Sequence, residues 1–402
     1  MDSSIALLIS IIVILLLIRL NVNISISIFI GALILGFLTI GFESLIQIAY
    51  IILSVNTIKI VVVVLLALTL GFSMEHFKLL DHLVSSAKNI LGSFSVVVLP
   101  ALLGFLPMPG GALISAIMIK DLVKEFKIDS ELATYINYWF RHLWVPVWPL
   151  FPSLIIALAV VEVDYTEIIK ATYPITIASI IAGLWFTRKL KIKFKYNLND
   201  LKKIVFSLYP ILLMSFLVLF VRLDLLVTLV LSLIILYIHK RPNIKDLKNI
   251  LKKAIDPKFI VLVMAVMSFK GLIEETNAAL TFFNHLNSVN FPVSIASCLL
   301  SFTIGFATGI EMSYSSIALP LLTSFTGVSS TFNPLNFMLV IASGFFGVML
   351  SPLHLCLVLT SEYYKADLRR VYRYLISSVL VGVVTVSMVY LFHELAKPRF
   401  SQ

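Results

Sequence analysis

The sequence LGFLPMPGGALISAIMIK, residues 103–120, decides how the rest of the chain is interpreted. It places Pro107, Pro109, Gly110 and Gly111 inside an otherwise apolar segment. Proline removes a backbone donor, and glycine admits conformations that a helix interior disfavours. In lipid, such a broken backbone is tolerated only where protein or a water-filled cavity satisfies its polar groups. The stretch therefore predicts a re-entrant hairpin over residues 93–123, whose tip lines a cavity within the membrane.

A second interrupted segment, TIGFATGIEMSYSSIALPLL, covers residues 303–322, about two hundred residues further on. Both segments place Gly-Phe just before a break made of small residues, at Gly104-Phe105 and Gly305-Phe306. Two interrupted apolar segments at matching positions of two halves indicate the binding site of a transporter. The second segment therefore predicts a second hairpin over residues 291–326.

The composition of the chain indicates an all-α polytopic protein that contacts the lipid bilayer. Of its 402 residues, 60% are hydrophobic and 13% are charged, whereas soluble domains are about 25% charged. The net charge of +10 is spread over short loops between apolar spans. This is the positive-inside pattern of membrane proteins and argues against a nucleic-acid partner. The two cysteines, Cys298 and Cys356, lie in apolar stretches and suggest neither a disulfide framework nor a metal site.

The two halves of the sequence resemble each other throughout. LLIRLNVNISISIFI around Arg19 resembles LFVRLDLLVTLVLSL around Arg222, LGFSMEHF resembles KGLIEETN, and Pro146 aligns with Pro352. This pattern predicts an internal duplication. The expected parts are a first repeat (residues 1–190, broken helix 130–160), a basic connector (191–203) and a second repeat (204–396, broken helix 336–360).

The charges predict how the repeats are oriented. Each repeat has three spans, a hairpin that does not cross, a broken helix and a last span, which makes five crossings and inverts the second repeat. Arg19, Lys120, Arg370 and the connector, residues 188–203, fall on one side, and Glu162 and Glu275 fall on the other. The positive-inside rule then predicts a multi-pass protein of the cell membrane. Both termini are expected outside the cell and the connector in the cytoplasm.

Three motifs, LPMPGGALISA, TGIEMSYSSIALPLL and SPLHLCLVLTSEYY, resemble signatures of an uncharacterised (domain of unknown function) family of integral membrane proteins. That family is grouped with the ion transporter superfamily, which includes gluconate permeases, divalent-anion sodium symporters and arsenite or citrate permeases. The resemblance implies two inverted repeats, a binding site between the hairpin tips, elevator-type motion and a possible homodimer. The tips here read Pro-Met-Pro-Gly-Gly and Ala-Thr-Gly instead of the symporters' Ser-Asn-Thr type. The coupling ion is therefore left as H⁺ or Na⁺.

The hairpin tips supply the expected substrate contacts. Helices that restart after Gly111 and Gly309 would direct free N–H groups at an anion such as a carboxylate. Hydroxyl groups accompany them, although hydroxyls in tightly packed membrane helices also bond simply to neighbouring backbone. The hydroxyl candidates are Ser115, Thr308, Ser313 and Ser351, with Ser315 and Ser316 as weaker ones.

Ionisable residues inside the apolar segments are candidates for charge transfer and charge recognition. Glu311 occupies the second tip, where a carboxylate indicates an ion or proton path, or else a helix cap. Arg141 can hold a substrate carboxylate in a bidentate fork or pair with Glu311. His142 and His354 are candidate proton relays. The alternative for Arg141 and His142 is a position at the cytoplasmic interface, beside Trp139 and Trp144.

The sequence thus predicts a secondary transporter of a small anionic metabolite, most simply an organic carboxylate, with no cofactor besides the coupling H⁺ or Na⁺. The alternative is an exporter or a carrier of a cationic or zwitterionic substrate, an amino acid or a metal cation, with Glu311 as its ligand. A channel is disfavoured by the pinched tips. An enzyme is disfavoured because EHFKLLDH, residues 75–82, lacks the HExxH spacing of a catalytic metal site.

Overall fold

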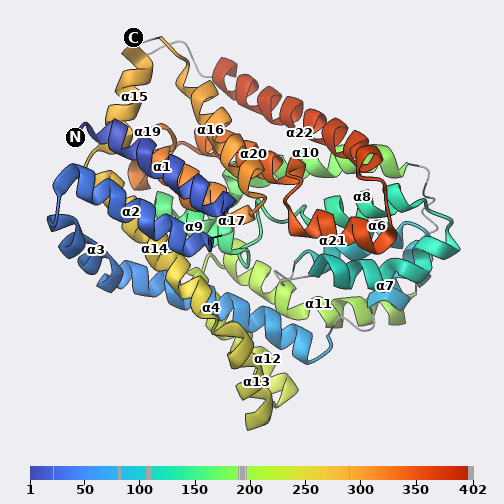
Figure 1. The fold of residues 1–402 in the computed structure, drawn as a ribbon. Helices are drawn as coiled ribbons and strands as arrows, with labels where there is room; N and C mark the ends of the chain where they lie inside the picture. Colours follow the sequence, from blue (N-terminus) through green and yellow to red (C-terminus); the bar gives the residue numbers. More distant parts are fainter. Residues whose placement is uncertain are drawn as a thin grey trace.

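The computed structural model describes residues 1–20, 22–79, 83–105, 111–188, 190, 195, 197–288 and 290–396. The secondary-structure elements of these residues are all helices, as the composition predicted (Figure 1). Among the described residues, five helical segments are long and apolar enough to cross a membrane, the fourth of them interrupted: Val55–His76, Tyr165–Thr187, Leu198–Leu219, Pro334–Tyr364 and Leu368–His393. The protein is a multi-pass membrane protein.

The first half of the chain forms ten helices among the described residues. They are α1 (Ser3–Arg19), α2 (Ile24–Ile40), α3 (Glu43–Leu53), α4 (Val55–His76), α5 (Leu83–Leu91), α6 (Ser95–Leu103), α7 (Gly111–Glu125), α8 (Ser130–Arg141), α9 (Pro152–Val161) and α10 (Tyr165–Thr187). The predicted hairpin corresponds to α6 and α7, and the predicted broken helix to α8 and α9.

The second half repeats this order. Its helices are α11 (Leu198–Leu219), α12 (Leu225–Lys240), α13 (Ile244–Ala254), α14 (Pro257–Glu275), α15 (Ala278–Ser288), α16 (Val293–Thr308), α17 (Glu311–Ser313), a π-helical turn η1 (Tyr314–Ala318), α18 (Leu319–Leu321), α19 (Thr323–Thr326), a 3₁₀ turn η2 (Ser329–Thr331), α20 (Pro334–Leu350), α21 (Leu355–Tyr364) and α22 (Leu368–Ala396). Here α16 to α19 form the hairpin, and α20 and α21 form the broken helix.

Several contacts between a helix of one half and a helix of the other half are repeated by the corresponding helices with the halves exchanged. Helix α14 packs on α2 and on α3, while α4 packs on α12 and on α13. Helix α1 packs on α15, while α11 packs on α5. The last helices of the halves, α10 and α22, lie side by side (Figure 1). These paired contacts are those of two similar units, while the inversion of one unit across the membrane stays a prediction.

Polar capping residues set where several helices begin. The side chains of Asp2, Asn23, Asp129, Asp224 and Asn333 each accept hydrogen bonds from backbone N–H groups in the first turn of the helix that follows. Such caps satisfy donors that have no partner within the helix. The caps thereby stabilise the first turns of α1, α2, α8, α12 and α20.

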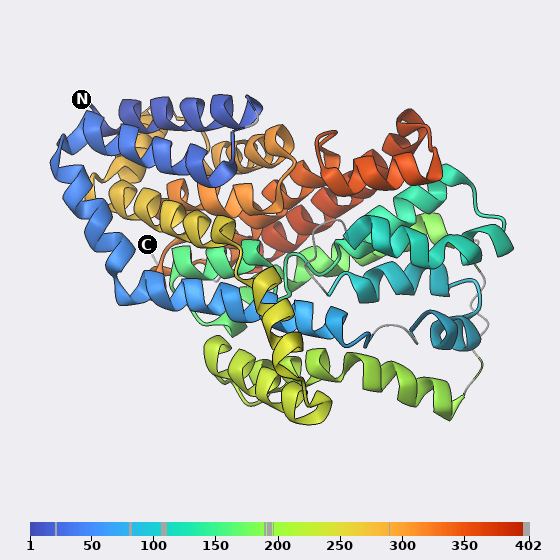
Figure 2. The same ribbon diagram turned by 60° about the horizontal axis from the view of Figure 1, so that its bottom comes forward.

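Four short helices, α3, α5, α13 and α15, are not among the predicted elements. Helix α3 and its counterpart α13 each have 11 residues. Helix α13 lies with α11 and α12 along one edge of the molecule (Figure 2) and packs on α4. His76 pairs with Asp246 at 2.9 Å, and this hydrogen bond lowers the pKa of the Asp246 carboxyl. Helices α3 and α13 are too short to be read as spans, and tertiary contacts hold them in place.

The second half of the fold begins inside the predicted connector. Helix α11 begins at Leu198, so that residues 198–203 of the predicted connector form its first turns. The capping side chain of Asn197 accepts from the backbone N–H groups of Asn199 and Asp200, which explains the earlier start. Basic side chains at this helix start led the sequence interpretation to assign them to the connector.

Helices α16 and α20 pack backbone against backbone. A Cβ atom on Gly305 would lie 2.3 Å from the carbonyl oxygen of Gly344, and one on Gly347 would lie 2.3 Å from the carbonyl oxygen of Phe302. The Ser301 hydroxyl also donates to the Val340 carbonyl at 2.7 Å. Small residues at the interface allow this close approach in membrane proteins. The contact fixes α16, the first helix of the second hairpin, on α20, the first part of the second broken helix.

We expect Gly347→Ala to lower the unfolding free energy by about 1–3 kcal/mol, because the added methyl group meets rigid backbone. The measurement is the melting temperature of the purified protein in detergent. Gly71→Ala is the matched control, since no atom lies within 4 Å of a Cβ placed there. Equal melting temperatures for the two variants would contradict the tight packing of α16 on α20.

Candidate functional site

The described parts of the two hairpins and of the two broken helices meet in the interior of the protein. Helix α8 packs on α6, α7 and α21, and α17 packs on α9 and α20. The breaks themselves lie between Arg141 and Pro152 and between Leu350 and Leu355. The second tip lies between Thr308 and Glu311. The ends of these helices bring together residues that are far apart in the sequence.

His142, His354 and Glu311 form the centre of this region. The Nε2 atoms of His142 and His354 lie 3.2 Å apart, and the Oε1 atom of Glu311 lies 3.3 Å from Nε2 of His142. His142 is 3% exposed and His354 is 5% exposed, whereas the side chain of Glu311 is 21% exposed. The structure thus groups the three residues that the sequence proposed as the coupling-ion site.

Backbone carbonyl groups fix the tautomers of both histidines. Nδ1 of His142 lies 2.6 Å from the carbonyl oxygen of Tyr138, and Nδ1 of His354 lies 2.8 Å from that of Gly309. A carbonyl oxygen only accepts hydrogen bonds, so both Nδ1 atoms carry a hydrogen. In the neutral rings, both Nε2 atoms then present lone pairs to each other. Two lone pairs at this separation, next to a carboxylate, favour a shared proton or another cation between them.

Arg141 lies at the start of the break, on the side of the first hairpin. One of its Nη atoms donates to the carbonyl oxygen of Leu103 at 3.1 Å, and a Cβ atom on Gly111 would lie 2.0 Å from the other Nη. The residue is 6% exposed, and α8 begins at Ser130 as predicted. The helix therefore does not begin later than predicted, and both Arg141 and His142 are buried inside the protein. The guanidinium group joins the end of α6 to the start of α7.

The hydroxyl groups of the second tip already have partners. The Thr308 hydroxyl lies 2.6 Å from that of Ser313 and donates to the Ile304 carbonyl at 2.8 Å. The Ser313 hydroxyl lies 2.7 Å from the carbonyl oxygen of Ile310. These bonds hold the tip in shape. They agree with the alternative given for these hydroxyls, in which Ser and Thr in tightly packed helices bond to neighbouring backbone.

Ser115 and Ser316 bond locally in the same way. The Ser115 hydroxyl donates to the Ala112 carbonyl at 3.0 Å, and the Ser316 hydroxyl donates to the Ser313 carbonyl at 3.4 Å. The hydroxyl of Ser315 is buried with no hydrogen-bond partner among the described residues. Direct contact of these residues with a substrate is not visible in the geometry and stays a prediction.

Gly309 connects the second tip to the second break. Its φ angle is +64°, and a Cβ atom there would lie 2.8 Å from the backbone nitrogen of His354 and 2.9 Å from the hydroxyl oxygen of Ser351. Ser351 in turn accepts from the backbone N–H of Leu353 at 3.2 Å and so shapes the break. Glycine is needed here both for its backbone angle and for the close approach.

The π-helical turn η1 follows the second tip. The N–H of Leu319 bonds to the carbonyl of Tyr314, five residues earlier. Pro320 lacks the N–H that would otherwise bond to the carbonyl of Ser316, which explains why the regular pattern is lost here. Such π-turns are frequent at functional sites. The sequence interpretation expected a break at the tip but not this irregular turn.

Three of the predicted site residues, Pro107, Pro109 and Gly110, lie outside the described residues. The part of the first tip that is described begins at Gly111.

Sequence reasoning missed two residues that the structure brings to the cluster of His142, His354 and Glu311, namely Tyr138 and Cys356. The ring of Tyr138 packs on His142 and His354, with centroids 4.9 Å and 5.4 Å away. The Cys356 sulfur and one nitrogen each of His142 and His354 lie within 4.8 Å of one another.

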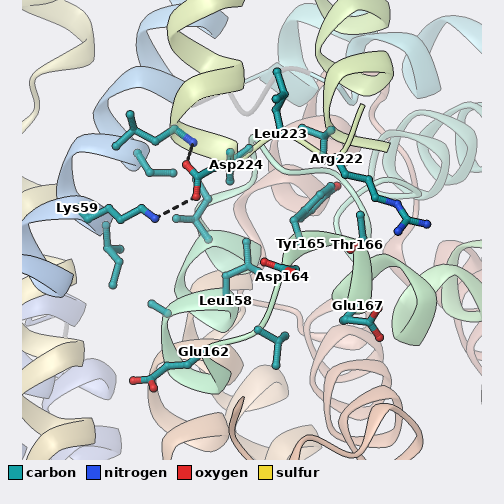
Figure 3. Close-up of a pocket in the computed structure, with 18 of the residues that line it drawn as sticks. Lys59, Leu158, Glu162, Asp164, Tyr165, Thr166, Glu167, Arg222, Leu223 and Asp224 are labelled. Carbon is teal, nitrogen blue, oxygen red and sulfur yellow. Dashed lines mark hydrogen bonds and ion pairs between the residues drawn. The ribbon is translucent and has the colours of Figure 1, made fainter. Parts of the chain in front are cut away.

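A large cavity lies apart from this cluster. It has a volume of about 1040 Å³ and lies between α4, the junction of α9 and α10, and the loop from α11 to α12 (Figure 3). Charged side chains of both signs line it, among them Lys59 and Asp224, which pair at 3.0 Å, and Glu162. None of the predicted site residues is among its lining residues. The cavity is on the side of the protein where the sequence interpretation placed the acidic loops.

The fold and the site define a polytopic α-helical membrane protein whose two halves each contribute a paired-helix hairpin and an interrupted helix to a buried ionisable cluster. The chain belongs to the DUF401 family, described as a protein of unknown function, whose family model matches residues 1–393. The predicted membership of an uncharacterised membrane protein family is therefore confirmed. No curated protein matches the chain in sequence.

A solved structure shares the fold. The crystal structure of the Alcanivorax borkumensis YdaH transporter, described as having an unusual topology, is similar to this chain with a TM-score of 0.61 and 13% sequence identity. The similarity covers 98% of this chain and 99% of the other. The whole chain therefore has the fold of a membrane transporter.

Proposed function

We propose that this protein is a secondary active transporter of a small anionic metabolite, most simply an organic carboxylate, coupled to H⁺ or Na⁺. The observation that carries the proposal is the cluster of Arg141, His142, Glu311 and His354 at the meeting point of both hairpins and both helix breaks. Ionisable groups inside a membrane protein are costly and usually belong to substrate or ion pathways. The fold shared with a transporter supports the same class.

In this proposal, Arg141 neutralises the carboxylate of the substrate. The guanidinium group is buried against the described ends of the first hairpin, where a planar pair of donors suits a carboxylate. Backbone N–H groups at the start of α7 add a positive helix end on the same side. The coupling cation belongs to the neighbouring cluster of Glu311, His142 and His354, whose converging lone pairs and carboxylate attract positive charge.

The mechanism proposed is alternating access, of the elevator type. The hairpins and broken helices pack mainly on one another, whereas α2, α4, α12 and α14 form a second set of mutual contacts through α2 with α14 and α4 with α12. Movement of the first set against the second would carry the cluster across the membrane. The cavity of Figure 3 lies beside both sets, along α4 and α9, and would serve as a vestibule.

The first experiment is a melting-temperature measurement on the purified protein with carboxylates, sugar acids, amino acids, amines and oxyanions, each with and without Na⁺ at two pH values. A ligand that binds only the folded state stabilises it by about 2.7 kcal/mol at a concentration of a hundred times Kd. We expect a carboxylate to raise the melting temperature and to accumulate in proteoliposomes when an H⁺ or Na⁺ gradient is imposed.

A second candidate function is an exporter or a carrier of a cationic or zwitterionic substrate. The two facing Nε2 atoms beside Glu311 favour it, because this arrangement attracts a cation. A response confined to amines, amino acids or metal cations, lost in Glu311→Gln and unchanged in Arg141→Lys, would replace the carboxylate proposal by this one. Saturable uptake that follows an ion gradient would separate either carrier from a channel.

A further inference from the structure

We infer that His142, His354 and Cys356, together with Glu311, form a binding site for a transition-metal cation of the Zn²⁺ class. The donor atoms are Nε2 of each histidine, Sγ of Cys356 and a carboxylate oxygen of Glu311. This inference departs from the sequence interpretation, which expected no metal site. It concerns binding of the metal alone, at residues that the proposed function assigns to the coupling cation. Metal binding would therefore change the identity of that cation, whereas the carboxylate contact of Arg141 is tested separately.

Two of the distances between the donor atoms, one between the histidines and one from Glu311 to His142, are those of ligands that share one metal. Two ligand atoms at about 2.0–2.1 Å from Zn²⁺, separated by the tetrahedral angle, lie about 3.3 Å apart. The two Nε2 atoms are 3.2 Å apart, and Oε1 of Glu311 is 3.3 Å from Nε2 of His142. The Cys356 sulfur and one nitrogen of each histidine lie within 4.8 Å of one another, which is wider than in a formed site, so the short Cys356 side chain has to move toward the metal to complete the set.

The surroundings of the histidines are those of metal ligands. A metal-bound histidine commonly donates its second ring N–H to a backbone carbonyl or a carboxylate, which fixes the tautomer and directs the other nitrogen at the metal. Both histidines do this, through the carbonyl groups of Tyr138 and Gly309. The ring of Tyr138 packs on both imidazoles and restricts their rotation. The two Nε2 lone pairs are therefore held in position before any cation binds.

The charge of the donor set suits a divalent cation in an apolar interior. When the metal binds, the Cys356 thiol loses its proton to solvent and the thiolate forms the bond to the metal. Two neutral imidazoles, one thiolate and one carboxylate then compensate the two positive charges of Zn²⁺. A neutral set avoids the large cost of an uncompensated buried charge. The combination of sulfur and imidazole donors selects Zn²⁺, Co²⁺ or copper over Na⁺, Mg²⁺ or Ca²⁺.

Two further features favour a cation at this place. Helix α8 ends at Arg141 with His142 as its cap, and α16 ends at Thr308 with Gly309 as its cap, so the negative ends of both helices lie at the cluster. The side chain of Glu311 is one-fifth exposed, and Cys356 is half-buried. The donor set is therefore not fully enclosed.

The test uses Co²⁺ as a spectroscopic probe on the purified, chelator-treated full chain. We expect one Co²⁺ per chain, with visible bands and a thiolate-to-cobalt charge-transfer band that Zn²⁺ abolishes by displacement. Cys356→Ser should remove the charge-transfer band. His354→Gln and His142→Gln should each weaken binding about a hundredfold or more, beyond the 10–100-fold cost of losing a residue that only orients a ligand.

Matched controls separate the site from general effects. Cys298→Ser changes the other cysteine, which lies on α16, and His393→Gln changes an exposed histidine at the end of α22. Both variants should bind Co²⁺ as the wild type does. Cys356→Ser alters a single atom, so it tests the inference even if a histidine variant fails to fold. No charge-transfer band in the wild type, or an unchanged band in Cys356→Ser, would overturn the inference.

Discussion

Arg141→Lys is expected to weaken carboxylate binding about a hundredfold, a loss of about 3 kcal/mol. Lysine keeps the positive charge but presents a single ammonium group in place of the planar guanidinium fork. It also cannot reach both the Leu103 carbonyl and the space over Gly111 that the guanidinium fills. The readouts are the carboxylate-induced rise in melting temperature and uptake into proteoliposomes.

A second variant tests the same contact without changing Arg141. In Gly111→Ala, the new methyl group would lie 2.0 Å from a guanidinium nitrogen and must displace it. We expect the carboxylate response to fall as it does in Arg141→Lys. Arg369→Ala, at an exposed position, is the control and should respond as the wild type does. Wild-type affinity in Arg141→Lys would remove Arg141 from the substrate site.

Gly309→Ala is expected to abolish the responses both to substrate and to metal and to destabilise the protein. A residue other than glycine at a φ of +64° costs about 1–2 kcal/mol. The added Cβ would also lie 2.8 Å from the backbone of Leu353 and His354, so the break must shift. That shift breaks the bond from His354 Nδ1 to the Gly309 carbonyl and turns the imidazole away from His142.

Gly309→Asn separates the two causes of this loss, which are backbone strain at a positive φ and the close approach of a Cβ atom to the break. Asparagine adopts a positive φ more easily than alanine but still carries a Cβ atom. If close packing is the main cause, Asn at this position is as harmful as Ala. Gly41→Ala is a control for strain alone, because its φ is +68° and no atom lies within 4 Å of a Cβ placed there. It should lose stability but keep binding. Recovery of binding in Gly309→Asn would contradict the packing argument.

The positions of the interruptions could be predicted because they depend on local backbone chemistry. The Ser351-Pro352 break and the Gly309 tip occur where residues that disfavour a helix stand inside apolar runs. Helices α3 and α13 escaped prediction, since neither is long enough to span the membrane and packing on α14 and α4 stabilises them. The sequence identified the Ser and Thr residues near the tips but not their hydrogen-bond partners, because the partner of a hydroxyl depends on which groups the fold places around it.

The amino-acid sequence alone determined that the chain is a membrane protein, where its helices are interrupted and that its two halves share one plan. Hydropathy, capping residues and the conformational limits of proline and glycine act over a few residues, so they can be read locally. Only the tertiary structure decided that His142, His354, Cys356 and Glu311 meet. These residues come from both halves of the chain. Their spacing and tautomers depend on which helix ends pack together, and the order of residues does not specify that.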